Sequence, residues 1–148
     1  MEPAPHYLPE TSAGLDDLVE ISLDSSRGFE QAAESIDDRA LAALFRECAE
    51  ERRGHADALQ RLLPGYHPTG SFEGTMHRWW LQLRGTLTGG DAQAILEEVD
   101  RGEQEILTRY EEVLQDHPAT PFHARLHRLY LEVMERRDIL RSLRTARS

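Results

Sequence analysis

Residues 95–113 read ILEEVDRGEQEILTRYEEV. Their apolar side chains recur every three or four residues, which is the spacing of a helix with one buried face. The apolar positions on that face are Ile95, Val99, Ile106, Tyr110 and Val113. Glu103 falls on the same face, where an unpaired carboxylate would cost several kcal/mol. The sequence therefore predicts that Glu103 is paired with a cation, protonated, or bound to a metal.

The same spacing predicts three more long helices, over about residues 15–36, 39–62 and 121–143. Asp37 or Asp38 is expected to cap the second helix, and Asp91 the helix around residues 95–113, because short acidic side chains accept hydrogen bonds from the first backbone N–H groups. Thr120 followed by Pro121 is a typical start for the last helix. No segment alternates with a two-residue period, so no sheet is predicted.

The connections between the helices indicate their arrangement. Short links make the first and second helices, and the third and fourth, antiparallel pairs. The link between the pairs is long and contains a shorter helical pattern over about residues 72–87. This is the plan of a ferritin-like four-helix bundle. We therefore expect an all-α ferritin-like bundle over residues 12–148, with a crossover helix between the second and third long helices, after a flexible proline-rich tail at residues 1–11.

A weak internal repeat points to two related helical hairpins. A shift of 81 positions places LDDL at residues 15–18 over LEEV at residues 96–99, and Phe29 over Tyr110. The same shift places Ser22 over Glu103. Helical periodicity turns a set of polar residues toward the interior: Ser22, Arg52, His55, Glu103 and Arg137, with Arg136 as the alternative to Arg137.

Several short motifs resemble the ferritin-like superfamily. They are ILEE at residues 95–98, GE at 102–103, YEE at 110–112, GF at 28–29, AAE at 32–34, and HR at 77–78 with Trp80. The resemblance extends over about residues 15–145 and is closest to uncharacterised bacterial four-helix-bundle proteins related to rubrerythrin and ferritin. Di-iron members of that superfamily carry one Glu on each of two helices and a Glu-x-x-His on each of the other two.

This chain departs from that pattern. Glu103 and His55 stand at two of the ligand positions, but Ser22 and Arg52 stand where glutamates are expected. The last helix has no Glu-x-x-His, and its central positions carry arginine. The missing carboxylates disfavour an oxidative di-iron centre.

The favoured interpretation is a buried polar network. In it, Arg52 and Arg137 neutralise Glu103, with Glu51 and Glu98 as further partners, because buried charges are normally paired. No cofactor is then expected.

The alternative is a residual metal site for iron, manganese or zinc. Glu51, His55 and Glu103 would be its ligands, since Glu51 and His55 are four residues apart and can share a helix face. His123 and His127 have the same spacing and could hold a surface metal ion, although such pairs are more often solvated.

Composition excludes several classes of function. The chain has 148 residues and a net charge of −10, which argues against nucleic acid as a general partner. All 17 basic residues are arginine, so chemistry that needs a lysine amine is excluded. Cys48 is the only cysteine, so no intrachain disulfide forms. No membrane span or signal peptide is recognised, so a cytoplasmic protein is expected.

These observations lead to two functional hypotheses. The first is a non-catalytic bundle that serves as a binding or stress-associated module. We expect it to form a homodimer through the crossover helix with Trp79 and Trp80, because these residues, with Met76 and Leu83, are more large apolar side chains than one face of a short helix can bury. The alternative is a metal-binding or weakly redox-active protein that uses the residual His/Glu site.

Overall fold

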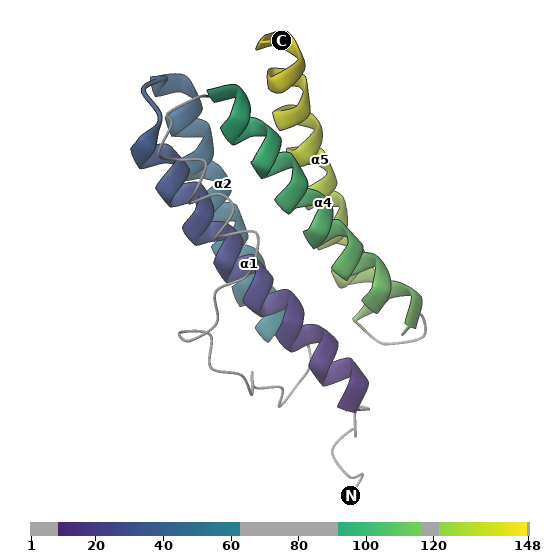
Figure 1. The fold of residues 1–148 in the computed structure, drawn as a ribbon. Helices are drawn as coiled ribbons and strands as arrows, with labels where there is room; N and C mark the ends of the chain where they lie inside the picture. The colour runs from purple at the N-terminus through teal and green to yellow at the C-terminus, as the bar shows by residue number, and fades with distance from the viewer. Residues whose placement is uncertain (1–8, 63–91, 117–121, 148) are drawn as a thin grey trace, which may run out of the picture.

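The computed structural model describes residues 9–62, 92–116 and 122–147 (Figure 1). These residues form the helices α1 (Pro9–Ser35), α2 (Arg39–Gln60), α4 (Ala92–Asp116) and α5 (His123–Arg147). They contain no strand, which confirms the all-α prediction for this part of the chain. None of the described helices is long and apolar enough to cross a membrane.

The four helices form two antiparallel hairpins, α1 with α2 and α4 with α5 (Figure 1). Helices α2 and α4 run in the same direction, so α2 ends at the opposite end of the bundle from the start of α4. The hairpins meet mainly through α1 and α4, and the contact between α2 and α5 is the least extensive. The expected crossover helix, with Trp79 and Trp80, lies outside the described residues, as do Asp91, Thr120 and Pro121.

The first helix begins earlier than expected. It starts at Pro9 rather than near Leu15, so residues 9–11, which were expected in the tail, belong to α1. Proline suits the first position of a helix for two reasons. Its φ angle is already helical, and a backbone N–H at that position would have no partner within the helix, so its absence costs nothing. A proline-rich composition alone therefore overstated the length of the tail.

Asp38 is the residue that caps α2. Its backbone is extended, with φ −70° and ψ 110°, and its carboxylate accepts a hydrogen bond from the backbone N–H of Leu41 at 3.0 Å. We expect Asp38→Ala to lower the free energy of unfolding by about 1 kcal/mol, because that N–H loses its partner. Thermal or urea unfolding measures the loss. Asp37→Ala, one residue outside the cap, should have less than half that effect, and equal losses in the two variants would contradict the assignment.

The buried apolar side chains fall into two clusters, one toward each end of the bundle. One contains Leu15, Leu18, Leu59, Tyr110 and Phe122 among others, and the second contains Phe29, Phe45, Ile95, Leu96 and Val99 among others. Between them lies a layer of buried polar side chains: Ser22, Ser25, Ser26, Arg52, His55 and Glu103. Four of the five polar residues singled out on the helix faces, all except Arg137, lie in this layer, which divides the core in two.

The internal shift of 81 residues extends over both hairpins. Buried pairs related by it are Leu18 and Val99, Phe29 and Tyr110, Phe45 and Leu126, and Leu59 and Leu140. In the polar layer the same shift pairs Ser22 with Glu103, and Arg52 with the buried Val133. The two hairpins therefore bury corresponding positions along their full length.

Candidate functional site: a buried arginine–carboxylate network

Arg52 lies at the centre of the polar layer. Its helix, α2, places it one turn before His55, facing α4. The side chains of Arg52 and Glu103 are both fully buried, with 0% exposure. Two parallel contacts join them: Arg52 Nε donates to Glu103 Oε1 at 3.3 Å, and Arg52 Nη2 donates to Glu103 Oε2. This two-pronged geometry is the strongest that an arginine makes with a carboxylate.

The third nitrogen of Arg52 binds the neighbours on its own helix. Arg52 Nη1 donates to Glu51 Oε1 at 2.9 Å and lies 3.3 Å from His55 Nδ1. A guanidinium only donates, so His55 Nδ1 has to accept, and the imidazole proton sits on Nε2. Burial, and then the charge of Arg52, lower the pKa of His55 to about 4. His55 is therefore neutral at neutral pH.

Glu51 connects the buried pair to the surface between α2 and α5. Arg136 from α5 donates through Nη2 to Glu51 Oε2 at 3.0 Å. Burial alone would raise the pKa of Glu51, but Arg136 and Arg52 outweigh it, so the pKa lies below its ordinary value. Glu51 is thus an ionised bridge between two arginines. A hollow of about 180 Å³, lined in part by Glu51, Glu132 and Arg136, opens the network to solvent.

Glu132 is a further member that the sequence did not reveal. Its Oε2 lies 3.3 Å from His55 Nε2, although the geometry is not that of a hydrogen bond. Burial, and then the charge of Glu51, raise the pKa of Glu132. The sequence does not indicate this contact, because Glu132 is a half-exposed residue outside the apolar face of its helix. Only the packing of α5 against α2 brings Glu132 close to His55.

Hydroxyl groups complete the polar layer. Ser26 Oγ donates to the carbonyl oxygen of Ala49 at 2.8 Å. The hydroxyls of Ser22, Ser25 and Tyr110 are buried and have no hydrogen-bond partner among the described residues. Ser22 nevertheless lies near enough to Tyr110 to favour its phenolate slightly, while burial raises the pKa of Tyr110 overall. Ser22 is therefore in the layer, as expected, but makes no direct bond to Arg52 or Glu103.

Arg137 occupies a different place from the one expected. It donates from Nε to Asp100 Oδ1 at 2.9 Å and also binds Gln104, on the outer side of α4. Arg136 is the α5 arginine that joins the network. The shift of 81 residues pairs Arg136 with His55. Extending the internal repeat into the last helix would therefore have selected Arg136 over Arg137 from the sequence alone.

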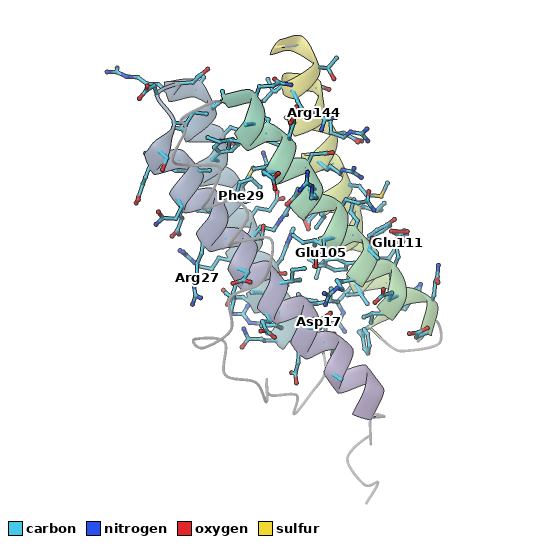
Figure 2. The ribbon with its side chains drawn as sticks, viewed as in Figure 1. Asp17, Arg27, Phe29, Glu105, Glu111 and Arg144 are labelled. Atoms are coloured by element: carbon cyan, nitrogen blue, oxygen red, sulfur yellow. The ribbon has the colours of Figure 1, made fainter. Side chains whose placement is uncertain are left out.

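Other charged contacts lie away from this centre. Glu98 pairs with Arg101 of its own helix at 3.2 Å. Arg109 joins Asp17 on α1 to Glu105 on α4, which face one another along the junction of the hairpins (Figure 2). Of these ion pairs only Arg109–Asp17 joins two helices, and partly exposed pairs of this kind each contribute little stability.

Comparison with protein families assigns the chain. A family model described as a domain of unknown function, DUF2383, matches residues 10–116. The chain belongs to this family. The match includes Arg52, His55 and Glu103 but ends with α4, so the DUF2383 model does not extend to Arg136 and Glu132. No curated protein matches the sequence.

A metal centre does not fit the buried network of this DUF2383 chain. Arg52 takes up both oxygens of Glu103, one oxygen of Glu51 and Nδ1 of His55, which are the atoms that a cation would need. The described residues include no group of three or more His, Cys, Asp or Glu side chains arranged for a metal ion. His123 and His127 stack with ring centres 6.4 Å apart, as a pair on one helix.

Cys48 lies in the buried core beside the network. Burial, and then the charge of Glu103, raise its pKa to about 12. The thiol is therefore protonated at neutral pH, and a protonated buried thiol is neither a nucleophile nor a metal ligand.

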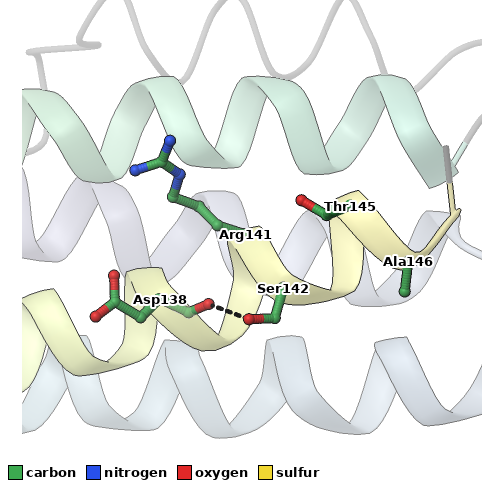
Figure 3. Close-up of a pocket in the computed structure, with 5 residues that line it drawn as sticks. All are labelled: Asp138, Arg141, Ser142, Thr145 and Ala146. Atoms are coloured by element: carbon green, nitrogen blue, oxygen red, sulfur yellow. Dashed lines mark hydrogen bonds between the residues drawn. The ribbon is translucent and has the colours of Figure 1, made fainter.

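The C-terminal half of α5 borders an open hollow of about 640 Å³ (Figure 3). Its lining residues are all on that helix, and Ser142 Oγ donates to the carbonyl oxygen of Asp138 at 3.0 Å within it. One helix face does not enclose a ligand, so this surface is not a binding site by itself.

Proposed function

We propose that this chain is a non-catalytic member of the ferritin-like superfamily in which an arginine–carboxylate network replaces the di-iron centre. It serves as a binding or stress-associated module. The observation that carries the proposal is the position of Arg52. A single guanidinium holds Glu103, Glu51 and His55 together where a metal would otherwise do so.

The arrangement of the helices supports the ferritin-like assignment. Two antiparallel hairpins, with α2 and α4 parallel, require a long crossover, which is the ferritin-like plan. The shift of 81 residues pairs Ser22 with Glu103 and His55 with Arg136. These correspond to the Glu and Glu-x-x-His positions of the di-iron pattern, and only Glu103 and His55 retain ligand residues.

The charges of the network support the absence of a metal. Arg52 and Arg136 balance Glu103 and Glu51, and His55 is neutral. Buried carboxylates that are already neutralised leave little electrostatic drive for a divalent cation.

We further propose a cytoplasmic homodimer through Trp79 and Trp80, which lie outside the described residues.

The first test is metal content. Untagged protein, measured by mass spectrometry as purified and after Fe²⁺ loading and desalting, is expected to be folded and to hold less than about 0.1 metal ion per chain. Near-stoichiometric metal that is lost in His55→Ala but kept in a His123→Ala/His127→Ala variant would contradict the proposal. Metal lost in the second variant alone would be surface capture and leaves the proposal standing.

A gain-of-ligand variant makes this test sharper. Ser22→Glu/Arg52→Glu removes the central cation and returns carboxylates to two of the di-iron positions. It is expected to be less stable than the parent without metal and to recover stability with Fe²⁺ or Mn²⁺, because binding to the folded state alone stabilises it. No metal-dependent recovery would argue against the ferritin-like correspondence of these positions.

One observation favours the alternative function. His55 Nε2 is buried, its ring is neutral, and Nε2 has no hydrogen-bond partner among the described residues. A neutral imidazole is the form that binds iron, manganese or zinc. A residual metal site at Glu51, His55 and Glu103 would require Arg52 to leave both carboxylates. The metal measurement with His55→Ala decides between the non-catalytic module and the metal-binding protein.

A further inference from the structure

The side of the bundle between α2 and α5 is open at one end as well as in the middle. Where α2 ends and α5 begins, a hollow of about 280 Å³ lies between the two helices. Its lining residues are Ala58, Arg61 and Leu62 from the α2 side and Arg125, Arg128 and Leu129 from α5. These two neighbouring helices contact each other little, so among the described residues little else closes this side of the bundle.

The rim of this groove is positively charged. Arg61, Arg125 and Arg128 are exposed, and none of them forms an ion pair with a carboxylate of the described residues. The chain carries 27 acidic side chains, so partners of opposite charge are abundant elsewhere on its surface. The nearest carboxylate along α5, Glu132, lies 3.3 Å from His55, and the charge of Arg128 acts on it only against a net rise in its pKa. Three guanidinium groups, one from the end of α2 and two from α5, therefore line one hollow.

The floor of the groove is apolar. Leu62 and Leu129 are 5% and 8% exposed, and Ala58 is partly buried against the same core cluster. An inorganic anion would use the rim and leave this floor uncovered. A ligand with an anionic head and an alkyl chain can contact both the rim and the floor. Its carboxylate accepts hydrogen bonds from the guanidinium groups, and its alkyl chain packs on the apolar residues.

We propose that this groove binds a small single-chain carboxylate amphiphile. The head lies among Arg61, Arg125 and Arg128, and the alkyl chain lies on Ala58, Leu62 and Leu129. The volume is slightly below the usual range of about 300–1,000 Å³ for small-molecule sites, which fits a short chain and excludes a two-chain lipid. The site goes beyond the proposed function and does not depend on the state of the Arg52 network.

Binding has a structural consequence. The ligand would touch both the end of α2 and α5, so it would join two neighbouring helices that contact each other little. A ligand that binds only the folded state raises its stability. The amphiphile should therefore raise the unfolding temperature as well as bind.

Octanoate tests the site on the full-length chain, with octan-1-ol and inorganic phosphate as matched probes. Octanoate at tenfold excess over its Kd is expected to raise Tm by roughly 3–6 °C. Octanol lacks the charge and phosphate lacks the chain, so each should bind at least about tenfold more weakly in calorimetry. Phosphate or octanol binding as tightly as octanoate would overturn the proposal, and so would the absence of octanoate binding.

Variants locate the site. Arg61→Gln/Arg125→Gln/Arg128→Gln should weaken octanoate binding by at least about tenfold, because the head loses its charged donors. Arg27→Gln, on the outer side of α1 (Figure 2), is the matched control and should have no effect. Ala58→Leu keeps all three arginines but fills the floor, and it too should weaken binding. Unchanged affinity in either groove variant overturns the proposal, and none of these outcomes alters the metal test of the proposed function.

Discussion

Glu103→Ala is expected to lower the free energy of unfolding by about 3–5 kcal/mol in metal-free buffer, because it leaves the guanidinium of Arg52 buried without its main partner. Glu103 supplies two of the contacts of Arg52, and both side chains are inaccessible to water. Glu51 and His55 remain beside Arg52, but Glu51 is already shared with Arg136. Urea unfolding of the parent and the variant gives the difference directly.

Two further variants show that the loss comes from the unpaired charge. Arg52→Met/Glu103→Leu removes both charges together and should recover most of the stability, since an apolar pair of similar volume is often as stable as a buried ion pair. Glu112→Gln, an exposed position on α4, should change stability by less than about 0.5 kcal/mol. A loss below about 1 kcal/mol for Glu103→Ala would mean that the Arg52–Glu103 pair is not the centre of the core.

The centre of the site was predictable because helical periodicity is a strong signal. Glu103 and Arg52 lie in the middle of apolar stripes on two different helices, and two opposite charges that are both buried have to meet. Asp38 was predictable to within one residue, because a cap is defined by its position before the first turn. These features depend on local sequence alone.

The rest of the site depends on packing that local sequence does not fix. Arg136 and Arg137 are neighbours at the edge of a helix face, and a long side chain at such an edge turns toward whichever carboxylate lies nearest. Arg137 meets Asp100 of α4, whereas Arg136 meets Glu51 across the opening between α2 and α5. Glu132 joins for the same reason, since it is outside the apolar stripe of α5 and comes to His55 only through the way that α5 packs.

The second large effect is a loss of stability on acidification that depends on His55. Its pKa is lowered from 6.5 to about 4 in the folded protein, first by burial and then by Arg52. Between these two values the unfolded chain binds more protons than the folded chain, so stability falls as the pH falls. The contribution is fully present above about pH 6.5 and is lost as the pH approaches 4; a shift of this size corresponds to about 3 kcal/mol.

Comparison with His55→Gln isolates this contribution. Glutamine keeps an acceptor for Arg52 and a donor toward Glu132 but does not titrate. The groups around position 55, namely Glu51, Arg136, Glu132, Glu103 and Tyr110, are present in both proteins, so their own acid responses largely cancel in the difference. The parent should therefore lose about 3 kcal/mol more than His55→Gln between pH 6.5 and 4. Parallel curves for the parent and His55→Gln would show that His55 is not held neutral in the core, and the contact from Arg52 Nη1 to His55 Nδ1 would then have to be abandoned.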